Sequence, residues 1–187
     1  MKLTLKRAFI APAFAALMVA APMTSVASQD GFSLKGTMWE QADGVDPHLL
    51  YAIAIAESQK YFSGGFIRPW PWAVNLKGKG YYFDSRKEAE EFVDQLISEG
   101  YTNMDIGPLQ VNTYWHGHRV QDFKDLFSLP VAIDVASDIL KEAMNSSPGD
   151  KALGIGRYHT WSDEQRAREY GTKVLKYWDV ISRSGGQ

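Results

Sequence analysis

The sequence predicts one mainly helical domain with a minor β component. Four segments carry apolar side chains at helical spacing: 46–58, 85–99, 130–144 and 162–181. A proline begins the third of them, and a polar N-cap candidate begins each of the other three. Between the first two, proline and glycine interrupt this periodicity, and short apolar runs flank residues 77–80, which indicates a β-hairpin. Since no segment of the sequence repeats, we interpret the chain as an all-α domain that carries a small β-hairpin insertion.

The first long helix places an acid among apolar residues. Asp46 is a good N-cap, and Pro47 suits the first helical position because its missing N–H would have no intrahelical partner. Leu50, Ile53 and Glu57 then follow on one face at i, i+3 and i+7. A carboxyl group on this stripe loses solvation, so burial should raise the pKa of Glu57 toward the range useful for donating a proton. The alternative is that Glu57 only marks the end of the buried part of the helix.

Caps, turns and prolines define the other elements. Ser85 caps the second long helix, and Glu88 takes the capping-box position three residues later. The prolines of segment 68–72 exclude a helix there, because each restrains the residue before it. The remaining predicted elements are a short helix at 37–42, a loop at 63–65, hairpin strands at 74–76 and 81–83, a loop or short helix at 102–113, and a short glycine-interrupted helix at 151–160.

Residues 1–27 have the composition of a signal peptide. Three basic residues form a positive start, an apolar run covers 8–21, and small residues at 25–27 suit a signal peptidase. The apolar run is shorter than the roughly 20 residues that span a bilayer, which argues against a membrane anchor. We therefore expect cleavage after Ala27, an exported domain at 28–187 with no stable membrane span, and a location in the periplasm.

Composition narrows the function classes of the exported domain. Three of the 20 basic residues belong to the signal peptide, so 17 basic residues stand against 22 acidic ones, a net charge of −5. An acidic domain without a basic run is a poor nucleic-acid binder, and we expect no nucleic-acid partner. The chain has no cysteine, which excludes a disulfide scaffold, a thiol nucleophile and a cysteine-ligated metal.

Three motifs in order give the domain a resemblance to a known family. Residues 45–58 read V-D-P-H-L-L-Y-A-I-A-I-A-E-S, residues 105–112 read D-I-G-P-L-Q-V-N, and residues 155–160 read I-G-R-Y-H-T. The chain resembles the lytic transglycosylases of the lysozyme-like superfamily (the SLT domain), in particular the subgroup associated with conjugation and secretion systems. The resemblance covers about residues 36–180, includes the predicted hairpin, and implies a lysozyme-like helical fold.

The resemblance also implies roles for particular side chains. Glu57 would be the catalytic acid, and the Tyr158 hydroxyl would hold its carboxyl group, so that the two form the catalytic pair. The residues expected to bind the glycan are Gly107, Leu109, Gln110 and His159, and those expected to give structural support are Ser58 and Asn112. The chain departs from the family pattern at His159, where the family has asparagine, so a hydrogen bond made there becomes pH-dependent.

The implied reaction cleaves the β-1,4 bond between N-acetylmuramic acid (MurNAc) and N-acetylglucosamine (GlcNAc) in peptidoglycan. Glu57 would protonate the bridging oxygen and would then act as base on the muramoyl 6-hydroxyl, which closes on C1 to give a 1,6-anhydro-MurNAc end. This chemistry needs no cofactor. The expected partners are peptidoglycan glycan strands and a conjugation or type IV secretion apparatus, for which the enzyme would open the wall locally.

Two alternatives remain open at this point. A muramidase would hydrolyse the same bond with Asp105 as a second carboxylate, although bracing its loop is the other role for this residue. A non-catalytic subunit would bind the glycan without cutting it. His116 and His118 could suggest a metal site, but no cysteine or carboxylate pair accompanies them, and we expect no bound metal.

Overall fold

The computed structural model describes residues 33–63 and 65–184. Within these ranges the chain is mostly helical with short antiparallel strands, which confirms the mainly-α class with a minor β component. The predicted signal peptide at 1–27 lies outside the described residues. None of the helices in the described ranges combines the length and the hydropathy that crossing a bilayer requires.

The elements follow one another along the chain as six α-helices, three 3₁₀ helices and six short strands within the described ranges. In chain order they are η2 (Met38–Gln41), α1 (Pro47–Ser58), β1 (Gln59–Tyr61), β2 (Ile67–Pro69), β3 (Ala73–Leu76), β4 (Lys79–Tyr82), α2 (Arg86–Ser98), β5 (Asp105–Ile106), β6 (Val111–Asn112), α3 (Thr113–His116), η3 (Gly117–Arg119), η4 (Phe123–Phe127), α4 (Leu129–Asn145), α5 (Lys151–Gly156) and α6 (Glu164–Ser184).

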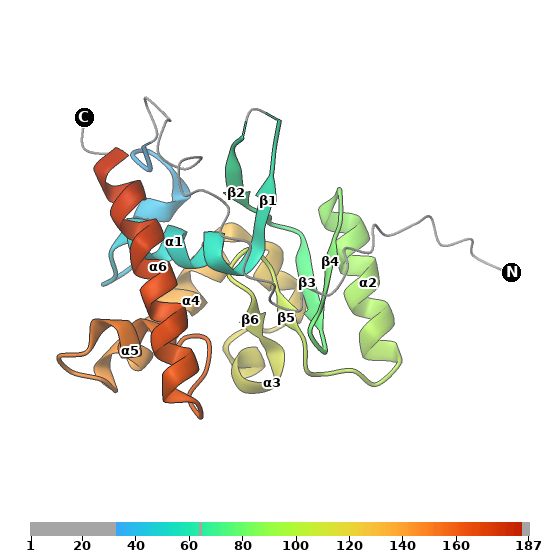
Figure 1. Ribbon diagram of the computed structural model, residues 1–187. Helices are drawn as coiled ribbons and strands as arrows, with labels where there is room; N and C mark the ends of the chain where they lie inside the picture. The colour runs from blue at the N-terminus through green and yellow to red at the C-terminus, as the bar shows by residue number, and fades with distance from the viewer. Residues whose placement is uncertain (1–32, 64, 185–187) are drawn as a thin grey trace, which may run out of the picture.

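Helix α1 runs through the middle of the helical part of the molecule (Figure 1). Its predicted start is confirmed, because Asp46 accepts a hydrogen bond from the His48 N–H at 2.8 Å and Pro47 is the first helical residue. Every side chain from Leu49 to Ile55 is buried, since α6, α4, η2 and β2 all contact the helix. Burial therefore extends around the whole helix and not only along the predicted stripe.

The predicted β-hairpin is present as β3 and β4, slightly earlier in the chain than expected. Its two-residue turn consists of Lys77 and Gly78, whose φ angles of 53° and 80° are the left-handed values that such turns require. β5 and β6 extend it to a four-stranded sheet of order β4-β3-β5-β6. The prediction of a loop or short helix at 102–113 was wrong for these strands, because two residues are too few for an alternating pattern to show.

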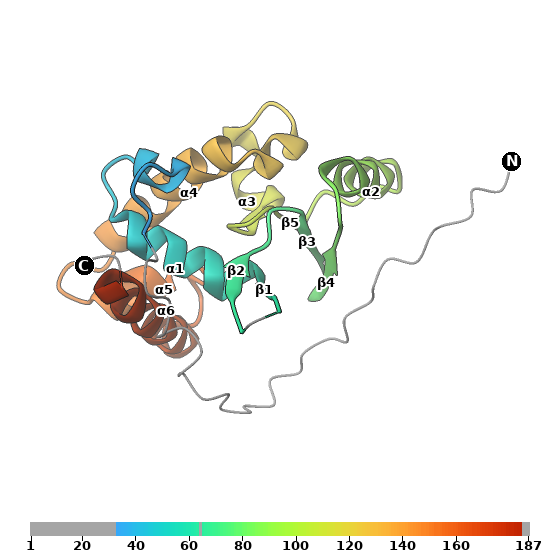
Figure 2. The ribbon, with the colours of Figure 1, turned by 90° about the horizontal axis from the view of Figure 1, so that it is seen from above.

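A second hairpin, β1–β2, follows α1 directly and projects from the molecule (Figure 1). The sequence predicts the loop at its tip but not its strands. Beyond the four-stranded sheet lies α2, so that β3 and β4 stand between α1 and α2 in both views (Figures 1 and 2). Ser85 caps α2 as predicted, because it accepts from the Glu88 N–H at 3.2 Å. The capping box is only half formed, since the Glu88 carboxylate accepts from the Asp84 N–H and not from that of Ser85.

Helices α5 and α6 pack against each other at the end of the molecule opposite α2 (Figures 1 and 2). Two glycines make this close approach possible, because a Cβ at Gly156 would overlap the carbonyl oxygen of Ala167 and one at Gly171 would overlap that of Ala152. Helix α6 in turn packs along α1. This arrangement brings the first turns of α6 beside the C-terminal end of α1.

Candidate active site

Glu57 lies in the last turn of α1, and only 15% of its side chain is exposed. The carboxyl group is therefore mostly enclosed, although the chain turns polar directly after it. Three tyrosines and one aspartate are close enough to feel its charge: Tyr82, Asp105, Tyr158 and Tyr170. A mostly enclosed carboxyl group near three phenols is a chemically distinctive setting at the end of an apolar helix.

The hydroxyl that holds Glu57 belongs to Tyr170 of α6. It donates a hydrogen bond to Glu57 Oε1 at 2.5 Å. Burial, and next the charge of Glu57, raises the pKa of Tyr170 well above its ordinary value. The phenol therefore keeps its proton across the physiological pH range and stays a donor to the carboxyl group.

Tyr158 does not make the contact that the sequence predicts. Its hydroxyl donates to the backbone carbonyl of Leu109 at 2.8 Å, and the expected hydrogen bond to Glu57 is the one that Tyr170 makes. Tyr158 follows the end of α5, and its hydroxyl contacts the loop between β5 and β6. It still lies within the electrostatic reach of Glu57, whose charge acts with burial to raise the pKa of Tyr158.

His159 lies next to both members of the hydrogen-bonded pair. Its Nδ1 atom is 3.8 Å from Glu57 Oε1, and its ring stacks on that of Tyr170 with centroids 4.6 Å apart and an interplanar angle of 3°. About a third of the His159 side chain is exposed, compared with 15% of that of Glu57. The imidazole is therefore the more accessible of the two side chains.

The end of α1 is tied to the β5–β6 loop by Ser58. The buried Ser58 hydroxyl lies 2.7 Å from the carbonyl oxygen of Pro108, to which it donates, and it accepts from the Trp70 N–H at 3.2 Å. Asn112 braces the same loop at its other end, where its Nδ2 donates to Asp105 Oδ1 at 2.8 Å. Both residues thus make contacts of the structural kind that the sequence analysis expects of them.

Three residues between β5 and β6 that were expected to bind glycan make their contacts within the protein. Leu109 is fully buried, so its side chain belongs to the core and cannot touch a ligand. Gln110 Nε2 donates to the carbonyl groups of Ala73 and Gly107, at 3.2 and 2.8 Å, which uses its donors within the protein. Gly107 is also buried, and its missing Cβ makes room for the carbonyl group of Leu126 and not for a sugar.

Asp105 couples the sheet to the Glu57 site. Burial raises the pKa of Asp105, the Asn112 hydrogen bond opposes this shift, and the charges of Glu57 and His159 act in opposite directions on it.

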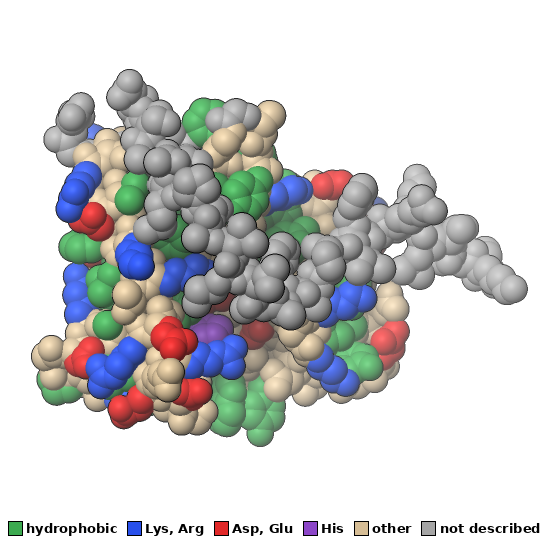
Figure 3. Space-filling model, viewed as in Figure 1, with side chains coloured by type: hydrophobic (Ala, Val, Ile, Leu, Met, Phe, Trp, Pro, Cys, Tyr) green, Lys and Arg blue, Asp and Glu red, His purple; other side chains and the backbone are tan. Residues whose placement is uncertain are grey.

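Among the described residues, no group of three or more histidine, aspartate or glutamate side chains is arranged to hold a metal ion. On the face shown in Figure 3, basic side chains are interspersed with acidic ones.

Tyr170 is the functional candidate that the motifs do not indicate. A signal was present, because Tyr170 falls on the apolar stripe of the last predicted helix, and a buried tyrosine usually finds a partner for its hydroxyl. The identity of that partner depends on how α6 crosses α1.

Comparisons of the chain with protein-family models, curated proteins and solved structures found no match.

Proposed function

We propose that the protein is a peptidoglycan lytic transglycosylase with a lysozyme-like fold. The observation that carries the proposal is the enclosed Glu57 carboxyl group, held by the Tyr170 hydroxyl at 2.5 Å at the end of a buried helix. Its position in the sequence matches the catalytic glutamate of the family that the chain resembles. We also propose that the enzyme acts in the periplasm and opens the wall for a conjugation or secretion apparatus.

The site supplies what breaking a glycosidic bond with one carboxyl group requires. Glu57 gives its proton to the oxygen between MurNAc and GlcNAc, and the bond from that oxygen to C1 breaks. The muramoyl 6-hydroxyl then attacks C1 and returns its proton to Glu57, so that no water is consumed. The Tyr170 hydroxyl donates to the carboxyl group throughout and stabilises the negative charge that appears when the proton leaves.

The experiment compares wild-type protein with Glu57→Gln on purified peptidoglycan sacculi. We expect wild-type protein to release muropeptides with 1,6-anhydro ends, identified by mass spectrometry, and Glu57→Gln to release none while still binding sacculi. The matched control is Glu91→Gln, which changes an exposed glutamate on α2 and should leave release unchanged. Loss of release in both variants would point to misfolding and not to chemistry.

A muramidase is the second candidate, because Asp105 provides another partly buried carboxyl group that the charge of Glu57 influences. The same experiment separates the two activities, since a muramidase leaves reducing MurNAc ends in place of anhydro ends. If wild-type protein binds sacculi and releases nothing, the non-catalytic binding subunit becomes the better interpretation.

A further inference from the structure

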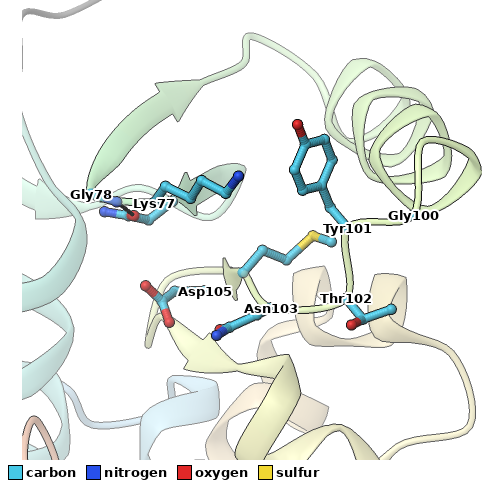
Figure 4. A pocket seen from close by; sticks show the side chains of 9 residues that line it. Lys77, Gly78, Gly100, Tyr101, Thr102, Asn103 and Asp105 are labelled. Carbon is cyan, nitrogen blue, oxygen red and sulfur yellow. Dashed lines mark hydrogen bonds between the residues drawn. The ribbon is translucent and has the colours of Figure 1, made fainter.

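A pocket of 380 Å³ lies beside the Glu57 site, between the β3–β4 turn and the segment that leads into β5 (Figure 4). Lys77 comes from the turn, and its side chain extends toward Tyr101 on the opposite side. The Lys77 Nζ atom is 4.7 Å from the centroid of the Tyr101 ring. Asn103 and Asp105 form the polar end of the pocket, and the buried Met104 also lines it.

Asp105 belongs both to this pocket and to the surroundings of Glu57. It lines the pocket, and the charges of Glu57 and His159 act on its carboxyl group. A hydrogen bond links the same two places, because Ser58, the residue after Glu57, donates at 2.7 Å to the carbonyl group of Pro108, three residues after Asp105. The pocket therefore lies on the segment that adjoins the candidate catalytic group.

The polar groups of the pocket are available for a ligand. Lys77 forms no ion pair with any residue that the structure describes, whereas Lys60, Lys124 and Lys141 all lie against carboxylates. Asn103 accepts from Asn112 through its Oδ1 atom, and its own amide N–H groups have no partner in the described part of the chain. The pocket thus offers one positive charge and one free amide donor next to a carboxylate.

We propose that this pocket binds the peptide stem that the muramoyl residue carries, with a stem carboxylate on Lys77. The inference rests on the proposed function, which supplies the strand. The sugars of that strand are uncharged, and its ionised carboxylates are on the peptide, so an unpaired ammonium group recognises the peptide and not the sugar. The Asp105 carboxylate, which also lines the pocket, can accept a stem amide N–H.

The test compares kcat/KM on peptide-bearing glycan strands with kcat/KM on strands whose peptides an amidase has removed, which leaves a lactyl carboxylate on each muramoyl residue but no stem. We expect wild-type protein to prefer the peptide-bearing strands, and Lys77→Gln to lower that preference about two- to fivefold, the effect of an exposed charge pair. The control is Lys79→Gln, because Lys79 lies over Tyr81 on the same hairpin but does not line the pocket. Equal kcat/KM on both strands for wild-type protein would overturn the inference and leave the proposed function standing.

A binding measurement keeps the inference testable if the protein cuts no glycan. The soluble stem tripeptide is titrated into isotope-labelled protein while the side-chain amide signals of Asn75 and Asn103 are followed by NMR. We expect these signals to shift in wild-type protein and to shift less in Lys77→Gln. Unchanged signals at millimolar tripeptide would overturn the stem-binding inference, whereas absent cleavage with shifted signals would count against the proposed lyase activity alone.

Discussion

Replacing Tyr170 with phenylalanine isolates the hydroxyl that contacts Glu57. The change removes one donor at 2.5 Å and leaves the ring that stacks on His159. A hydrogen bond to a charged group contributes about 1.5–3 kcal/mol. In the proposed mechanism negative charge develops on Glu57 as it gives its proton to the glycosidic oxygen, so the lost stabilisation falls on the transition state. We therefore expect kcat to fall roughly 10- to 150-fold with little change in KM.

Tyr158→Phe is the matched control for this prediction. It removes the hydroxyl that donates to the carbonyl group of Leu109, so it should cost about 1–3 kcal/mol of folding stability and lower the melting temperature by about 2–12 °C. Its effect on kcat should be smaller than that of Tyr170→Phe. The assay is anhydro-muropeptide release at saturating substrate, paired with thermal melting of each variant. Full activity of Tyr170→Phe beside an inactive but stable Tyr158→Phe would refute the assignment of Tyr170 as the residue that orients Glu57.

Two further predictions concern stability. Gly171→Ala should lower the free energy of unfolding by about 3 kcal/mol, because the new Cβ would overlap the Ala152 carbonyl group and push α5 from α6; a urea titration measures this. Asp105→Asn should stabilise the protein relative to wild type at pH 7, and this advantage should vanish toward pH 4. The reason is that burial raises the folded pKa of Asp105, so the folded state favours the protonated side chain. The stability that the protonated Asp105 contributes is fully present below the unfolded pKa of about 3.9 and is lost as the pH rises through the folded pKa.

Each stability prediction has a contrary outcome. For the helix pair, Gln165→Ala on the exposed side of α6 serves as control, and equal stabilities of this variant and Gly171→Ala would mean that the helices separate at no cost. For Asp105, the measurement is urea unfolding at several pH values between 4 and 7. A variant whose stability relative to wild type falls as the pH rises would mean that the Asn112 hydrogen bond outweighs burial.

The elements that the sequence predicts well are those governed by local chemistry. The start of α1 follows from Asp46 and Pro47, the Ser85 N-cap starts α2, and the tight turn of the main hairpin forms at Lys77 and Gly78. Each feature depends on hydrogen bonds or backbone angles of residues at most four positions apart. The strands β5 and β6 were missed because each is only two residues long, and because β5 pairs with β3 across about 30 positions of the chain.

In the candidate site, too, local features could be predicted from the sequence, whereas contacts between distant residues could not. The sequence by itself determined that Glu57 ends an apolar helix, that Ser58 follows it, and that a tyrosine lies on the stripe of the last helix. Only the tertiary structure decided that Tyr170, 113 positions from Glu57, is its hydrogen-bond partner, while Tyr158 turns to Leu109. It also decided that Leu109 points into the core. Helical spacing fixes which residues share a face, but the direction in which each face points is set by packing between helices far apart in the chain, which no local pattern encodes.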